Sequence, residues 1–229
     1  MAAPSPENTA VFILDCDNTL LDNDAVKADT DARLRTLLGD DLTERFWQFY
    51  EEVRAKTGTV DYPLALESFA GEVGDADLMA RVRDAVMDYP FAQRLYPGAL
   101  AALEHLSTLG LPTIVSDGDM VYQPMKIEQS GLAAAVGGRV LIYVHKEDHL
   151  DEIMQRWPSA LYVMVDDKLR ILSATKARLP DRFVTVHVRQ GHYGHDEKTY
   201  DPGPDLTLDH IAQLQGLTLD DFRRHVGRA

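Results

Sequence analysis

Cysteine is nearly absent from this chain of 229 residues, which contains only Cys16. A single cysteine excludes an internal disulfide and is typical of a reducing compartment. The apolar runs are far shorter than the roughly 18 residues that a membrane-spanning helix needs. The first ten residues also lack the basic segment and apolar core of a secretion signal. We therefore expect a cytoplasmic protein that has no membrane as a partner.

Basic residues are also scarce, because 23 Lys and Arg stand against 37 Asp and Glu and leave a formal net charge of −14. A chain this acidic is poorly suited to bind nucleic acid or an anionic membrane. It would also repel an anionic substrate unless the binding site carries local cations. The sequence therefore predicts no nucleic-acid partner, and it leaves the oligomeric state unknown.

Beyond Pro97, helical and extended patterns alternate along the chain. Apolar runs predict strands at 11–14, 111–115, 139–144, 161–165 and 183–188, with a short extended segment near 206. Periodic patterns predict helices at 99–109, 121–129, 148–156, 169–177 and 208–214, with a final short helix near 220–226. Strands that alternate with helices indicate crossover connections and a parallel sheet.

A block of helices interrupts this alternation directly after the first strand. Helical patterns at 25–38, 42–56, 64–73 and 76–87 leave no second strand among them. We interpret the block as an insertion that forms a cap over the sheet. The sequence therefore predicts an α/β fold with a Rossmann-like three-layer α/β/α parallel-sheet core at residues 10–22 and 91–229, and an inserted α-helical cap at residues 23–90.

The first predicted strand ends in two acids, Asp15 and Asp17. Residues two apart in an extended chain point to the same side. Two carboxylates this close repel each other unless a cation or a proton lies between them. The pair therefore indicates a metal site or an acid/base site. An acidic turn that only ends the strand is the alternative, because Asp and Asn are common in turns.

Ser116, Lys146 and the Asp166-Asp167 pair stand at the ends of three later predicted strands. Taken singly, Ser116 could be a turn residue, Lys146 a solvated lysine and the acid pair a helix cap. The carboxyl ends of parallel strands, however, share one edge of a sheet, where ligands bind. Their joint placement therefore favours a catalytic site.

Four acids and one lysine would form a poorly balanced cluster of charge. Mg²⁺ prefers carboxylate oxygens and would restore the balance. Mg²⁺, a lysine and a hydroxyl together can neutralise and hydrogen-bond a phosphoryl group. We therefore expect Mg²⁺ as the cofactor and a phosphorylated substrate.

This set of residues resembles the four motifs of the haloacid dehalogenase (HAD) superfamily. Residues 15–19, Asp-Cys-Asp-Asn-Thr, resemble the first motif, Ser116 the second, Lys146 the third and Asp166-Asp167 the fourth. The resemblance covers nearly all of the chain, because the spacing and the helical insertion after the first motif also match. It implies phosphoester hydrolysis, because the family's dehalogenases and phosphonate-cleaving members lack an acid at the position of Asp17.

The resemblance also implies a role for each motif residue. Asp15 would be the nucleophile that forms an aspartyl-phosphate. Asp17 would protonate the leaving oxygen and later activate the hydrolytic water. Lys146 would hold both Asp15 and the phosphate.

Phosphate binding would involve the hydroxyls of Thr19 and Ser116 and the backbone amides around Asp117 and Gly118. Asp15, Asp166 and the backbone carbonyl of Asp17 would bind Mg²⁺, with Asp167 as a direct or water-mediated ligand.

One departure from the family concerns the fourth motif. Many members carry a further acid four or five residues after it, whereas this chain has Arg170, Ile171 and Leu172 there. The metal site would then depend on the adjacent Asp166-Asp167 pair.

The expected function is Mg²⁺-dependent hydrolysis of a small phosphorylated metabolite, because a cap leaves little room for a phosphoprotein. A phosphosugar mutase of the same fold is one alternative. A non-catalytic binding module is another, although the intact acid pair argues against it. His187, His192 and His195 could suggest a zinc site, but their loose spacing favours a surface loop.

Overall fold

A single parallel sheet forms the centre of the protein in the computed structural model, which describes residues 10–226. The strand order is β3-β2-β1-β4-β5-β6, and every pair is parallel. The strands are β1 (Ala10–Leu14), β2 (Gly110–Asp117), β3 (Val140–Tyr143), β4 (Leu161–Asp166), β5 (Phe183–Val188) and β6 (Leu206–Leu208). The order reverses direction between β1 and β4, which makes this the topological switch point of the sheet.

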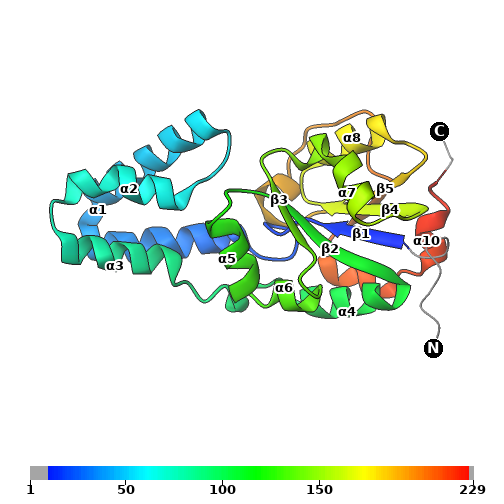
Figure 1. Ribbon diagram of the computed structural model, residues 1–229, viewed down its shortest axis with the longest axis horizontal. Helices are drawn as coiled ribbons and strands as arrows, with labels where there is room; N and C mark the ends of the chain where they lie inside the picture. Colours follow the sequence, from blue (N-terminus) through cyan, green and yellow to red (C-terminus); the bar gives the residue numbers. More distant parts are fainter. Residues whose placement is uncertain (1–9, 227–229) are drawn as a thin grey trace.

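Side chains of β1 alternate between two helical layers. Ala10, Phe12 and Leu14 pack in the core on the side of α4 (Ala99–Leu109), η4 (Ile211–Gly216) and α10 (Leu219–Arg223). Val11 and Ile13 pack on the opposite side with α7 (Leu150–Arg156) and α8 (Leu169–Arg178). Figure 1 shows α8 and α4 on the two faces of the sheet. The predicted three-layer α/β/α core is therefore confirmed.

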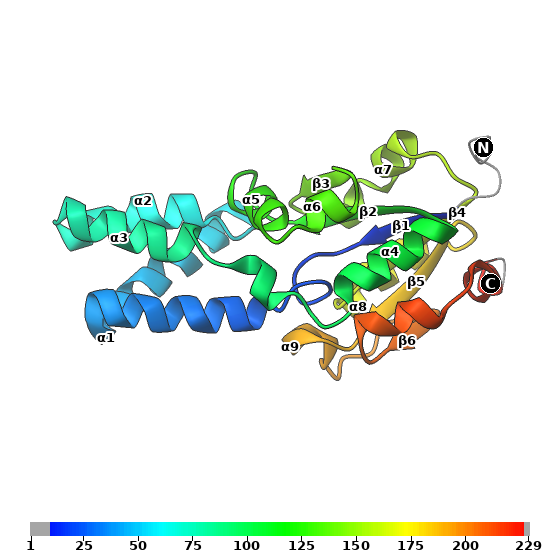
Figure 2. The same ribbon diagram turned by 90° about the horizontal axis from the view of Figure 1, so that it is seen from below.

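Three helices directly follow β1: α1 (Asn23–Thr57), α2 (Tyr62–Val73) and α3 (Ala76–Met87). These helices, here called the helical insertion, project beyond the edge of the sheet where β1 ends (Figures 1 and 2). The carboxylates of Asp61 and Asp75 cap α2 and α3 by accepting from backbone N–H groups, at 2.8 and 3.0 Å. The sequence-based expectation of continuous helix after the first strand is confirmed.

The predicted helices at 25–38 and 42–56 form one helical segment with a break. Gly39 has φ 75° and ψ 178°, which interrupts α1 at the position where we expected the first helix to stop. This left-handed φ is readily accessible to glycine. The expected aromatic core of the insertion is also present, because Phe46 is buried and its ring meets that of Phe69 at 5.5 Å.

Several short elements differ from the expected pattern. The helix expected at 208–214 begins later, as the 3₁₀ helix η4, because Leu208 still belongs to β6 and accepts a hydrogen bond from the Arg189 backbone N–H. The sequence did not predict η2 (Phe91–Arg94), α6 (Leu132–Ala135), η3 (Lys146–Asp148) and α9 (Gly191–Gly194). Elements of three or four residues are too short to show a helical period. Within residues 10–226, none of the helices is long and apolar enough to cross a membrane.

Two antiparallel connections join the helical insertion to the sheet. Leu21 and Leu95 form an isolated antiparallel bridge. The Asp22 N–H donates to the Arg94 carbonyl at 2.8 Å, and the Tyr96 N–H donates to the Leu20 carbonyl at 3.0 Å. The outgoing and returning segments therefore hold each other side by side.

A second contact ties the first turn of α1 to α9. One Asp24 carboxylate oxygen lies 2.6 Å from the ring Nδ1 of His192, and the other accepts from the His192 backbone N–H at 2.8 Å. Burial alone would raise the pKa of Asp24, but the hydrogen bonds from His192 and Asn18 outweigh it and lower that pKa below its usual value.

We expect Asp24→Asn to lower Tm at about pH 6, and to lower it progressively less in more acidic buffer. A carboxylate whose pKa is depressed by folding stabilises the protein above its unfolded pKa of about 3.9, and this stabilisation is lost as pH falls through the folded pKa. Because the side chain is 40% exposed, the effect should be at most about 1 kcal/mol, or about 2–4 °C. Thermal unfolding of both proteins across the acid range measures it. Asp88→Asn, on an exposed carboxylate after α3, is the control; a gap that is unchanged in acid would contradict the assignment.

Candidate active site

The chemistry-bearing side chains gather at the carboxyl ends of β1, β2 and β4. Leu14 pairs with Ile114 of β2 and Val165 of β4, so the next residues on these strands reach the same edge. Asp15 extends the β1 ladder, with its N–H donating to the Val165 carbonyl at 3.0 Å. Asp15 and Asp166 therefore meet at the switch point of the sheet, where open α/β folds bind ligands.

Lys146 is the cation at the centre of this edge. Its side chain is 1% exposed, and its ammonium nitrogen lies 2.5 Å from Asp15 Oδ1 and 2.7 Å from Asp166 Oδ2. The ammonium also donates to the Val115 carbonyl at 3.2 Å. Asp117 also fixes the backbone at Lys146, because its carboxylate accepts a hydrogen bond from the Lys146 N–H at 2.9 Å.

The charges of neighbouring groups shift the pKa values of Lys146 and Asp15. Burial would lower the pKa of Lys146, but Asp15 and Asp166 outweigh it and raise that pKa. Burial would raise the pKa of Asp15, but Lys146 and Lys168 outweigh it and hold that pKa below its usual value. Asp15 is therefore a carboxylate at neutral pH, the form that a nucleophile requires.

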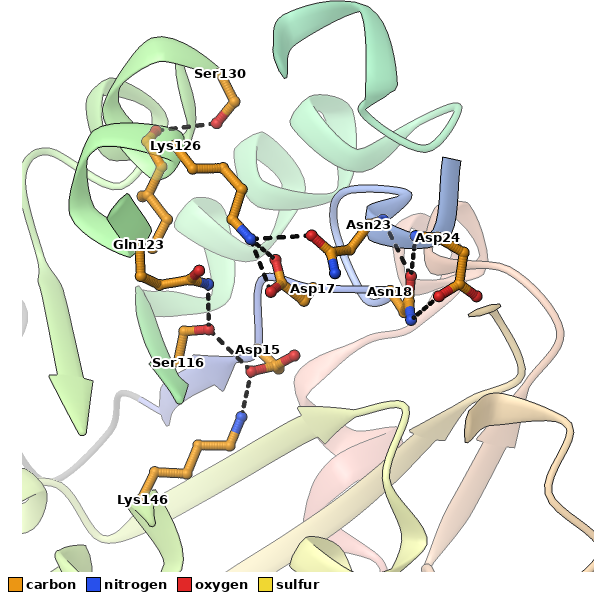
Figure 3. Close-up of polar contacts among 11 residues, drawn as sticks. Asp15, Asp17, Asn18, Asn23, Asp24, Ser116, Gln123, Lys126, Ser130 and Lys146 are labelled. Atoms are coloured by element: carbon orange, nitrogen blue, oxygen red, sulfur yellow. Dashed lines mark hydrogen bonds and ion pairs between the residues drawn. The ribbon is translucent and has the colours of Figure 1, made fainter. Parts of the chain in front are cut away.

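Ser116 lies against the same carboxylate (Figure 3). Its hydroxyl donates to Asp15 Oδ1 at 3.3 Å, and it accepts from Gln123 Nε2 at 2.9 Å. Gly118 makes room for this arrangement, since a Cβ there would lie 2.7 Å from the Gln123 Cβ. The Gly118 N–H, expected to face a phosphate, instead donates to the Tyr143 carbonyl at 2.9 Å within the sheet. This conformation therefore gives Gly118 a packing role and leaves its amide engaged.

Three buried acids form a compact group beside Lys146. Asp15, Asp166 and Asp167 each offer a carboxylate oxygen, and these oxygens all lie within 4.8 Å of one another. Among the described residues, Asp15 Oδ2 and both Asp167 oxygens have no hydrogen-bond partner. Burial, together with the charges of Asp166 and Asp15, raises the pKa of Asp167 well above its usual value. Unpaired carboxylate oxygens in a buried acidic group are the donors that a hard divalent cation takes, so these residues fit a metal such as Mg²⁺.

Asp17 belongs to a different set of contacts. Its carboxylate is 23% exposed, and its two oxygens lie 2.6 and 2.7 Å from the ammonium of Lys126, a residue of α5 (Tyr122–Gln129). The same ammonium donates to Asn23 Oδ1 at 3.1 Å. Figure 3 shows this group beside, and separate from, the contacts of Asp15. The Asp17 side chain is outside the group of three acids, so the only part of this residue left for the expected metal is its backbone carbonyl.

The remaining expected residues lie near the site or in the surrounding structure. Thr19 is buried, and its hydroxyl has no hydrogen-bond partner among the described residues. Arg170 forms an ion pair with Glu147, while Ile171 and Leu172 are buried in the core, so these three positions supply no further acid.

The three histidines in question have separate environments. His187 lies 3.2 Å from the Asp167 carbonyl, while His192 contacts Asp24. No group of potential metal ligands in residues 10–226 includes a histidine. His187 belongs to β5, as the sequence predicts, whereas His192 lies in the short helix α9 and not in the expected loop.

Lys126 and Lys168 are the site lysines that sequence reasoning missed. Lys168 directly follows the acid pair, and its backbone N–H donates to Asp166 Oδ1 at 2.8 Å. Burial would lower the pKa of Lys168, but the three acids outweigh it and raise that pKa. Lys126 carried a signal too, because it shares the buried face of α5 with Tyr122 and Ile127, and a lysine on a buried face needs a partner.

No family model matches the sequence, and no curated protein matches it. A solved structure from Burkholderia xenovorans, described as a haloacid dehalogenase-like hydrolase, is 46% identical over 93% of this chain and 99% of that chain, with a TM-score of 0.83. A 2-haloacid dehalogenase from Pseudomonas syringae is 15% identical over 91% of this chain and 97% of its own, with a TM-score of 0.64. The HAD-hydrolase YfnB from Bacillus subtilis, solved bound to magnesium, is 18% identical over 92% and 98%, with a TM-score of 0.57. The last two similarities show the fold alone.

We expect Mg²⁺ to raise the Tm of the wild-type protein and to leave that of Asp167→Asn unchanged. Saturation at about one hundred times Kd corresponds to about 2.7 kcal/mol, or about 5–10 °C. Without added metal the variant should be more stable than wild type, because it removes a buried like charge. Thermal shift measurements with and without Mg²⁺ test both signs. Asp151→Asn, at an exposed ion pair with Arg178, should keep the wild-type shift, and a full shift in Asp167→Asn would exclude this residue as a ligand.

Proposed function

The chain belongs to the haloacid dehalogenase-like (HAD-like) hydrolases, and from this premise we propose that it is a Mg²⁺-dependent phosphatase that hydrolyses a small phosphorylated metabolite through an aspartyl-phosphate. The observation that carries the proposal is that two acids at the end of β1 have separate environments. Asp15 is a buried carboxylate held by Lys146, and Asp17 lies apart on Lys126. Nucleophilic attack and proton transfer need two such groups.

In the proposed first step, a carboxylate oxygen of Asp15 forms a bond to phosphorus as the bond from phosphorus to the leaving oxygen breaks. Asp17, in its protonated form, gives its proton to that oxygen, and the alcohol departs. Lys146 and the Ser116 hydroxyl stabilise charge on the phosphoryl oxygens. Mg²⁺, when held by Asp15, Asp166, Asp167 and the Asp17 carbonyl, would supply further neutralisation of that charge.

In the second step, water attacks the phosphorus of the aspartyl-phosphate. Asp17, left as a carboxylate by the first step, takes a proton from the water. The bond from phosphorus to the Asp15 oxygen breaks, which releases phosphate and restores the Asp15 carboxylate. The same two acids thus return to their starting states.

The helical insertion supports a small substrate in this proposal. We assign residues 23–90 to a cap and residues 10–22 and 91–229 to the core, as the sequence predicts. Tyr50 of α1 and Tyr62 of α2 reach the side of the site where Tyr122 lies, with ring centroids 5.0 and 4.5 Å apart along this row. Closure by such a cap would exclude bulk water from the aspartyl-phosphate. A cytoplasmic location also remains part of the proposal.

We expect wild-type protein with Mg²⁺ to release phosphate from at least one small phosphomonoester and to release no halide from 2-haloacids. Asp15→Asn should abolish turnover, and Asp17→Asn should lower kcat by about 10²–10⁴-fold. A phosphate-release screen over phosphorylated metabolites and an aryl phosphate measures this, with Asp209→Asn on an exposed carboxylate as the control. Isomerisation of a phosphosugar without phosphate release would favour a mutase, and halide release would favour dehalogenation. Failure of the wild type across the whole panel would overturn the enzyme assignment.

A further inference from the structure

The buried Lys126 ammonium is the strongest feature that the four family motifs leave unexplained. The side chain is 2% exposed, although it lies on α5 close to the helical insertion. Removing an ammonium from water costs several kcal/mol unless a counter-charge and hydrogen bonds offset it. Here both oxygens of Asp17 and the amide oxygen of Asn23 provide that compensation.

Lys126 and its two partners come from three different parts of the fold. Asp17 follows β1 in the core, Asn23 is the first residue of α1, and Lys126 belongs to α5. One ammonium therefore joins the core, the start of the helical insertion and a helix between them (Figure 3). Without Lys126, the Asp17 carboxylate would have no cation within ion-pair distance in the described part of the chain.

A row of three tyrosine rings ends at Tyr122, beside Lys126. Tyr62 lies between Tyr50 and Tyr122 in a row of rings. The Lys126 ammonium, which pairs with Asp17, lies 5.6 Å from the centroid of the Tyr122 ring. Burial raises the pKa of all three hydroxyls, and the Asp17 charge adds to each increase. The Tyr122 hydroxyl is buried and has no hydrogen-bond partner in the described part of the chain. A buried hydroxyl without a partner can donate a hydrogen bond to the oxygen of an incoming ligand.

We propose that Lys126 is a positioning residue that holds the Asp17 carboxyl group on the leaving-group side of the site, and that Asp17, Asn23 and Tyr122 form a subsite for the leaving oxygen of an alkyl phosphomonoester. This inference rests on the proposed phosphatase activity. Lys126 does not touch the phosphoryl group; it acts through Asp17. An alkoxide is a poor leaving group and requires the proton from Asp17, whereas 4-nitrophenolate departs without one.

The matched variants are Lys126→Met, which removes the charge, and Lys126→Arg, which retains it. Lys176→Met is the control, because Lys176 is also a largely buried lysine paired with an aspartate, 3.0 Å from Asp205, but it lies on α8 outside the site. Each protein is assayed with Mg²⁺ on the best alkyl phosphomonoester from the screen and on 4-nitrophenyl phosphate. Circular dichroism and Tm establish that each variant is folded.

We expect Lys126→Met to lower kcat/KM for the alkyl ester by about 10²-fold, the contribution of a positioned acid. With 4-nitrophenyl phosphate, stopped-flow absorbance should show a burst of about one nitrophenolate per site, at a rate within about 3-fold of the wild-type first step. A slow steady state should follow, because water attack still needs Asp17. Lys126→Arg should restore part of the alkyl activity, and Lys176→Met should behave as wild type with both esters.

Two results would overturn the inference alone: alkyl turnover by folded Lys126→Met within about 3-fold of wild type, or equal loss of alkyl turnover and of the nitrophenolate burst. Equal loss would show that the residue maintains the whole site. A wild type that hydrolyses neither ester would overturn the proposed function, and this inference with it.

Discussion

The structure depends on a buried ammonium between two buried carboxylates. Lys146 is 1% exposed and contacts both Asp15 and Asp166, which belong to neighbouring strands at the switch point of the sheet. Each of these ions would cost several kcal/mol to bury alone. The pairing is possible only because β1 and β4 are parallel neighbours and β3 ends close enough for the following residues to reach them. The sheet order and the ion pair are thus two parts of one constraint.

Local charge also reconciles the acidic chain with an anionic ligand. The chain carries a formal net charge of −14, yet Lys146 and Lys168 lie among the three acids of the site. Three carboxylates and two ammonium groups leave one negative charge, and a divalent cation would change it to one positive charge. The site would then attract a phosphate dianion that the rest of the surface repels.

Much of this site could be predicted because it follows directly from strands. Buried strands appear in the sequence as apolar runs, and the residues after them are placed by the sheet, so the sequence pattern alone brings Asp15, Ser116, Lys146 and Asp166 to one edge. Lys126 could not be placed in the same way, because it lies within a helix whose rotation depends on tertiary packing. The Gly118 amide shows a similar limit: its hydrogen bond to Tyr143 depends on the register between β2 and β3, which the sequence does not specify.

The two acids after β1 illustrate how a fold separates roles that the sequence places side by side. Strict alternation would direct Asp15 and Asp17 to one side, where their repulsion would favour a shared proton or cation. The chain instead leaves the ladder after Asp15 and turns, with the N–H groups of Leu20 and Leu21 donating to the Cys16 carbonyl at 2.9 and 3.0 Å. Asp15 then pairs with a lysine that follows β3, and Asp17 with a lysine from α5. Because each carboxylate has its own cation, a change at one lysine should leave the other acid in place, which is the condition for a nucleophile and a proton carrier to act independently two residues apart.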